Sequence, residues 1–67
     1  MEEHYVIIRH EDANIYAKPC KDCDQWDTEL GNIMLRSYNI DSINNCIYYL
    51  SLKNPTYNAH ILSNIKQ

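Results

Sequence analysis

The chain has 67 residues, a formal net charge of −3 at pH 7, and six basic residues against nine acidic ones. This length suits one thin core, so we expect residues 1–67 to form a single small α+β domain. The chain has a lone glycine, Gly31, and no stretch near the roughly 18 apolar residues of a membrane span. The sequence therefore excludes glycine-rich phosphate-binding loops and membrane-spanning helices.

The expected compartment is the cytosol, because the acidic residues 1–12 lack the apolar core of a signal peptide. In a reducing compartment Cys20, Cys23 and Cys46 are thiols or metal ligands rather than disulfides. The scattered basic residues also argue against binding to nucleic acid, which needs clustered Lys and Arg.

A β-hairpin is expected at the start of the chain. Residues 4–10 read HYVIIRH, a run of strong strand formers bounded by charge. Residues 11–14 favour a turn, and residues 15–18 resume extended character up to Pro19. Because Pro19 cannot donate to a ladder, it ends the second strand or marks an edge.

A first helix is expected over residues 24–38. Asp24 and Asp27 have the spacing of a capping box, and acidic side chains suit the positive end of a helix dipole. The following apolar residues recur three and four apart, which predicts one buried helical face: Trp26, Leu30, Ile33, Met34 and Tyr38.

Residues 41–53 are expected to form a second helix, because apolar residues again recur three and four apart. The alternative is a strand over residues 45–52, where Ile and Tyr favour extended structure. Pro55 suits the first position of a third helix, with Tyr57, Ile61 and Ile65 on its apolar face. The predicted order is a two-stranded hairpin followed by three short helices, ββααα, or ββαβα if residues 45–52 form a strand.

Cys20 and Cys23 are the candidate metal ligands. Two thiols separated by two residues can bind one metal from a tight turn, and they form half of most structural zinc sites. The remaining ligands would come from His10, Cys46 or His60, which make no second close pair. The same motif serves as a redox pair in thiol–disulfide oxidoreductases, but this chain is too short for their framework.

The acidic charge is concentrated in one half of the chain. Residues 1–33 hold eight acidic and three basic residues, a net −5, whereas residues 34–67 carry a net +2. An acidic half suits a partner protein with a basic surface. The serines and histidines are dispersed and form no catalytic set, so we expect no enzymatic activity. The sequence predicts a small acidic protein-binding regulator or inhibitor, with the candidate interface residues Glu11, Asp12, Asp24, Asp27, Tyr48 and Tyr49.

In composition alone, the chain resembles the small accessory proteins encoded by phages and other mobile elements. This resemblance implies an anti-defence role, in which the protein blocks host restriction, CRISPR or transcription machinery. Two alternatives remain. One is a small zinc-stabilised domain built on Cys20 and Cys23. The other is a helix-turn-helix nucleic-acid binder formed by residues 24–38 and 41–53, whose second helix lacks basic residues at its start.

Overall fold

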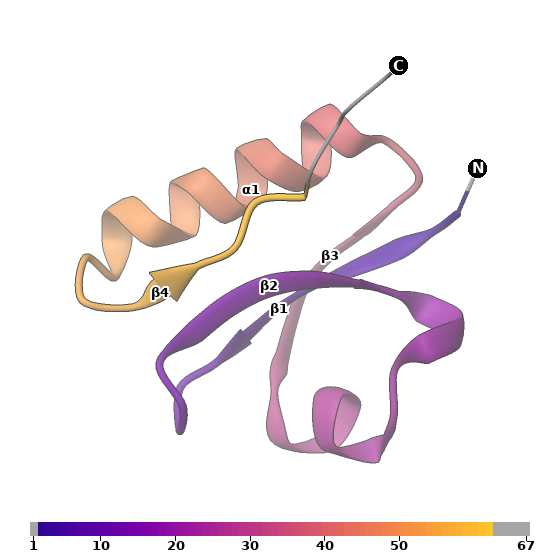
Figure 1. The fold of residues 1–67 in the computed structure, drawn as a ribbon, viewed down its shortest axis with the longest axis horizontal. Coiled ribbons are helices and arrows are strands. Elements are labelled where there is room, and N and C mark those ends of the chain that lie inside the picture. The colour runs from indigo at the N-terminus through magenta and orange to yellow at the C-terminus, as the bar shows by residue number, and fades with distance from the viewer. Residues whose placement is uncertain (1, 63–67) are drawn as a thin grey trace.

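The computed structural model describes residues 2–62, in which four strands form one mixed sheet and one α-helix lies on one face of it (Figure 1). The strands are β1 (His4–Arg9), β2 (Asn14–Pro19), β3 (Asn32–Ser37) and β4 (Asn58–Ala59), and the helix is α1 (Ile40–Lys53). The order across the sheet is β3-β1-β2-β4. Two short helical turns, η1 (Cys20–Asp22) and η2 (Trp26–Leu30), lie between β2 and β3.

The predicted hairpin is present. β1 and β2 pair antiparallel from His4 opposite Pro19 to Arg9 opposite Asn14. Ala13 closes the turn with a φ of 55°, a left-handed conformation that is more common for glycine or asparagine. Its backbone N–H donates to the carbonyl oxygen of His10 at 3.3 Å.

The predicted helix over residues 24–38 is wrong. Only η2 is helical there, a single π-helical turn, after which Gly31 is extended (φ −98°, ψ 166°) and β3 begins. β3 pairs antiparallel with β1 and contains a bulge, so Ile33 lies opposite Ile7 while Leu35 lies opposite Val6. The bulge adds one residue, so β3 has three consecutive apolar residues, Ile33, Met34 and Leu35, in place of the alternation typical of strands. The three–four spacing that predicts a helix depends on residues outside β3.

The segment after β3 forms the helix that the apolar spacing favours, so the alternative strand over residues 45–52 is also wrong. α1 has 14 residues, and its N-cap is Asn39, whose side-chain oxygen accepts a hydrogen bond from the backbone N–H of Ser42 at 3.0 Å. The third helix predicted from Pro55 is absent up to residue 62, where the chain instead turns and forms β4; Ile65 lies outside the described residues.

The observed order is therefore β-β-β-α-β, and the predicted fold class, ββααα or ββαβα, is corrected to an α+β fold with a mixed sheet and one main helix. No helix of residues 2–62 has the length and apolar character needed to cross a membrane.

The main core lies between α1 and one face of the sheet. It is made entirely of aliphatic side chains: Val6, Ile8, Ile15, Ile43, Ile47 and Leu50. Burying each of these contributes about 1.5–3 kcal/mol, so this layer is the main source of stability in a chain of this size. Cys46 packs at the margin of the cluster.

The last described segment is held by specific hydrogen bonds. β4 pairs parallel with the start of β2, and the backbone N–H of His60 donates to Ile15 at 2.8 Å. The side chain of Asn44 bonds both backbone groups of Leu62, with its amide nitrogen 3.1 Å from the carbonyl oxygen and its oxygen 2.9 Å from the N–H. These contacts close the apolar layer from the side of β4.

Candidate functional site

The connection between β2 and β3, residues 20–31, lies on the side of the molecule away from α1 (Figure 1). We call it the Trp26 loop. Beneath it lies Ile7, which is fully buried although it does not belong to the cluster under α1, since its side chain points to the opposite face from those of Val6 and Ile8. The loop therefore acts as the cover of the second face of the sheet.

Asp27 anchors the Trp26 loop to the sheet. The residue is only 4% exposed, and its carboxylate is the acceptor of three hydrogen bonds. The hydroxyl of Tyr16 donates to Oδ1 at 2.7 Å, and the ammonium of Lys18 donates to Oδ2 at 2.7 Å. Both donors come from the same face of β2, because residues two apart on a strand point the same way.

Asp24 and Asp27 also cap each other. The backbone N–H of Asp24 donates to Oδ2 of Asp27, and the N–H of Asp27 donates to Oδ1 of Asp24, each at 3.1 Å. This is the reciprocal arrangement that the sequence spacing predicts, although the helix it begins is only one turn long. The capping fixes the loop backbone directly before Trp26.

The ionisation of this network is fixed across the neutral range. Burial raises the pKa of Asp27, but the hydrogen bonds from Lys18 and Tyr16 outweigh it and hold that pKa well below its usual range. Burial and the hydrogen bond to Asp27 raise the pKa of Tyr16 to about 12. Neither group changes protonation near pH 7, so this network suits an anchor and not proton transfer.

Gly31 lets the end of the loop approach the sheet closely. A Cβ at this position would lie 2.7 Å from Cγ2 of Ile7 and 2.8 Å from the carbonyl oxygen of Asp27. Neither space accommodates a methyl group without displacement of the backbone. The single glycine of the chain is therefore used where the loop meets the strand.

The anchored loop presents Trp26 to solvent. Its side chain is 56% exposed, and the neighbouring exposed residues include Asp22, Asp24 and Glu29. Trp26 was expected in a helix core, and the structure places it on the surface because the helix does not form. The loop thus combines a large exposed apolar side chain with three exposed acidic residues.

The charge balance of the described residues strengthens this acidic character. Within residues 2–62, four ion pairs engage Arg9, Lys18, Lys21 and Arg36 with Asp12, Asp27, Glu2 and Glu3. Lys53 is the one basic residue of that part of the chain outside these pairs. The acidic residues outside them are Glu11, Asp22, Asp24, Glu29 and Asp41.

The other predicted interface residues lie apart from the Trp26 loop. Glu11 and Asp12 are exposed in the turn before β2, at the opposite end of that strand from the loop, and Asp12 pairs with Arg9 at 3.3 Å. Tyr48 and Tyr49 are exposed on α1. The six predicted residues therefore lie in three separate places: the hairpin turn, the Trp26 loop and α1. Of the two in the loop, Asp27 is buried and engaged within the chain.

The two candidate zinc ligands lie at the start of the loop. The backbone N–H of Cys23 donates to the carbonyl oxygen of Cys20 at 3.3 Å, and both thiols are free. Among residues 2–62, no three His, Cys, Asp or Glu side chains gather where they could hold a metal ion. Burial raises the pKa of the Cys23 thiol, which favours the protonated form over the thiolate that binds metals.

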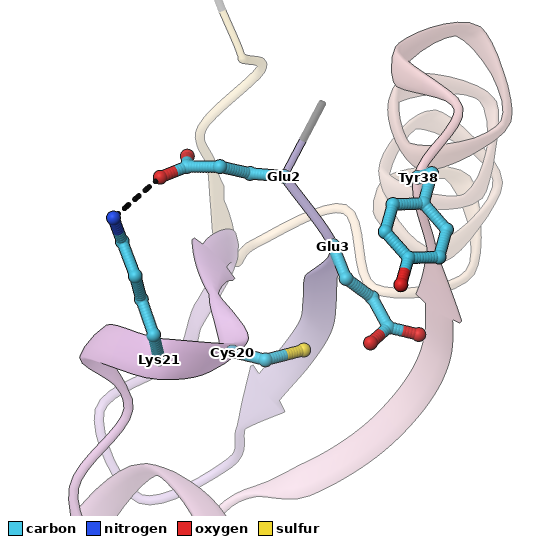
Figure 2. A pocket seen from close by; sticks show the side chains of 5 residues that line it. All are labelled: Glu2, Glu3, Cys20, Lys21 and Tyr38. Carbon is cyan, nitrogen blue, oxygen red and sulfur yellow. Dashed lines mark ion pairs between the residues drawn. The ribbon is translucent and has the colours of Figure 1, made fainter.

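An open pocket of about 310 Å³ lies at the start of the loop, lined by Glu2, Glu3, Cys20, Lys21 and Tyr38 (Figure 2). Its charged side chains are already paired: Lys21 with Glu2 at 3.0 Å, and Glu3 with Arg36 at 2.8 Å. The pocket therefore offers no free charge to orient a ligand, and the Trp26 loop is the stronger candidate site.

Sequence reasoning missed Tyr16 and Lys18, the two residues that anchor the loop. The available signal was their spacing of two on a predicted strand, which places both on one face. It did not indicate that a buried carboxylate eleven residues from Tyr16 would meet them there.

No family model matches this chain, and no curated protein or solved structure is significantly similar to it. The class is set by the architecture of residues 2–62, a small α+β fold with a mixed sheet and one main helix. The helix-turn-helix alternative lacks its first helix, because residues 32–37 form a strand.

Proposed function

We propose that this protein is a small protein-binding regulator or inhibitor, and that it attaches to a basic surface of its partner through the Trp26 loop. The observation that carries the proposal is the exposure of Trp26 on a loop whose backbone is anchored by the buried Asp27 carboxylate. Trp is among the residues most enriched in binding hot spots, because it offers a large rigid contact area.

The anchoring favours binding in a second way. A loop that is already ordered loses less conformational entropy on association than a loop that must order on contact. The hydrogen bonds of Asp27 and the close packing of Gly31 order this loop before any partner arrives. The partner therefore meets Trp26 on a fixed backbone.

The charge indicates the chemistry of the partner. Asp22, Asp24 and Glu29 are exposed in the same loop as Trp26 and form no ion pair with the described residues, so they complement Lys and Arg on another protein. Proteins that handle nucleic acid carry such basic surfaces. This partner chemistry agrees with the compositional resemblance to mobile-element proteins that block host restriction, CRISPR or transcription machinery, and with action in the cytosol.

The test begins with the partner and ends with purified components. The tagged protein is used to capture binding proteins from a lysate of the native host, and the candidate partner is then purified and titrated calorimetrically. We expect Trp26→Ala to weaken the complex by about 30-fold or more. We expect Asp22→Asn with Glu29→Gln to weaken it by about 3- to 10-fold at low salt, and heparin to compete with the protein for its partner.

The matched control is Ile61→Ala, because Ile61 is a large apolar residue with a similar exposure of 54% that lies after β4 and outside the Trp26 loop. This variant should bind the partner as the wild type does. Equal affinities for the Trp26→Ala variant and the wild type would overturn the proposal.

A further inference from the structure

The side of α1 that faces away from the sheet carries an unusual set of exposed side chains. Tyr48, Tyr49 and Leu52 are 61%, 56% and 62% exposed, and Asp41 and Asn45 are exposed on the same side. We call these five residues the α1 outer face. Asp41, Asn45, Tyr48 and Leu52 follow one another at spacings of four, three and four, so they form one line along the helix, opposite the buried core residues.

The charges at the two ends of this face are opposite in sign. Asp41 lies in the first turn of α1 and Lys53 in the last, and neither forms an ion pair with the described residues. Their backbones are separated by about 18 Å, given the rise of an α-helix. The Lys53 ammonium lies 5.2 Å from the centre of the Tyr49 ring, which keeps this charge beside the outer face.

This pattern is complementary to itself when it is reversed. If two copies of α1 lie antiparallel, Asp41 of each copy meets Lys53 of the other, and the two helix dipoles oppose each other favourably. Leu52 of one copy then lies beside Asp41 of the other, and Tyr48 of one copy lies against Asn45 of the other. A twofold axis at the middle of the helix produces all of these contacts twice.

We propose that the α1 outer face is a self-association surface and that its occupant is a second copy of this chain, packed antiparallel about a twofold axis. One helix of 14 residues covers less than the roughly 800 Å² per partner of a standard interface. The dimer is accordingly weak, with a dissociation constant on the order of 100 µM.

The dimer leaves the Trp26 loop free, because the loop and α1 lie on opposite sides of the sheet (Figure 1). Two Trp26 loops in one assembly would bind a repetitive or dimeric partner with higher avidity than one loop alone. The self-association itself does not depend on the proposed function.

The first test is sedimentation velocity of the purified protein between about 10 µM and 1 mM at low salt, a range chosen around the expected affinity. We expect a reversible monomer–dimer equilibrium. Leu52→Asp should weaken the dimer by about 10-fold or more, since it replaces an apolar contact with a carboxylate that lies beside Asp41 of the other copy. Tyr48→Ala provides a second, milder variant, and circular dichroism verifies that both variants are folded.

Met34→Asp is the matched control, because Met34 is 48% exposed on β3, which lies at an edge of the sheet. This variant should dimerise as the wild type does. Trp26→Ala should also leave the dimer unchanged, so a failure of the dimer is distinguishable from a failure of the proposed binding loop.

The second test addresses the antiparallel arrangement. Asp41→Lys and Lys53→Asp should each weaken the dimer by about 3- to 10-fold, because each converts two attractive pairs into repulsive ones. An equimolar mixture of the two variants restores both attractions and should associate more tightly than either variant alone.

A protein that stays monomeric at 1 mM would overturn the proposal. So would a dimer that tolerates Leu52→Asp and Tyr48→Ala but is lost in Met34→Asp, since that result assigns the contact to the edge of β3. A mixture of the two charge variants that associates no better than its components would overturn the antiparallel arrangement.

Discussion

The two faces of the sheet are covered in different ways. The face under α1 is sealed by aliphatic side chains, with Ile43 and Ile47 fully buried against Val6 and Ile15. The opposite face buries Ile7, and its cover is tied down by the ion pair and hydrogen bonds of Asp27. One face is apolar and adaptable, and the other is polar and directional.

The two covers therefore contribute different properties: one stabilises the fold, and the other positions the Trp26 loop. Apolar burial is non-directional and roughly proportional to area, so it stabilises the fold without fixing one backbone conformation. A buried carboxylate with three hydrogen-bond donors has strict geometry. Removing one partner costs more free energy than the intact network contributes, because it leaves a buried polar group unpaired. We infer that α1 supplies most of the stability, while the Asp27 network sets where Trp26 is presented.

The largest expected effect is on the apolar face. Ile47→Ala leaves a cavity between α1 and the sheet and should lower the free energy of unfolding by about 3–5 kcal/mol. A core of this size supplies about the same amount in total, so the variant should be largely unfolded at 25 °C. Urea denaturation followed by circular dichroism measures this loss. The control is Leu52→Ala at an exposed position, whose free energy of unfolding should lie within about 0.5 kcal/mol of the wild-type value.

Asp27→Asn should have the next largest effect. It removes the charge that Lys18 and Tyr16 contact, and we expect the free energy of unfolding to fall by about 2–3 kcal/mol. This is less than for a fully buried pair, because Lys18 is partly exposed. Relative to the wild type, hydrogen exchange of the variant should be accelerated more in residues 20–31 than in β1 and α1. Equal acceleration in all of these elements would contradict the separation of stability from positioning.

The Asp27 carboxylate also gives the stability of the wild type an acid dependence that Asp27→Asn should lack. The pKa of Asp27 is lowered in the folded protein from its ordinary value of 3.8, so its contribution to stability is present above that pH and is lost as the pH falls below it. Unfolding midpoints between pH 5 and 3 should therefore fall more steeply in the wild type than in Asp27→Asn.

Gly31→Ala tests the close contact at the end of the loop. The added methyl group meets Ile7 and the backbone of Asp27, and we expect a loss of about 1–2 kcal/mol. The fluorescence of Trp26 should change with it, because the loop must move away from the sheet. An unchanged spectrum together with unchanged stability would show that the contact tolerates a side chain.

Tyr16→Phe should have the smallest effect, about 1 kcal/mol at neutral pH from one lost hydrogen bond. Folding raises the pKa of Tyr16 from 10.0 to about 12, so the stability linked to its proton is present below pH 10 and is lost as the pH rises toward 12. Thermal melts between pH 9 and 11.5 should show a shallower decline for Tyr16→Phe than for the wild type.

The elements that sequence reasoning located correctly have regular patterns. The hairpin has two runs of strand formers around a polar turn, and α1 has an uninterrupted three–four spacing from Ile43 to Leu50. In both segments the local pattern agrees with the tertiary environment, so one period identifies the element. The capping pair of Asp24 and Asp27 was identified for the same reason.

The error at residues 24–38 has a physical source. A bulge in β3 places Ile33 and Leu35 opposite residues on different faces of β1, so the strand has no alternating pattern that would identify it. The three–four spacing that predicts a helix links residues of β3 with apolar residues before and after it. The sequence also does not predict the anchoring role of Asp27, because the positive end of the helix dipole already explains an acidic residue at a helix start. Only the tertiary structure shows that Lys18 and Tyr16 lie over it.

The bulge in β3 also affects how the molecule behaves in a crowded solution. Within residues 2–62, β3 is an edge strand, and open edges are templates on which chains pair into fibrils. A bulge twists the edge and interrupts the flat ladder that an incoming strand needs, and Arg36 adds a charge to it. The irregularity that obscured this strand in the sequence thus protects the chain from edge-to-edge aggregation.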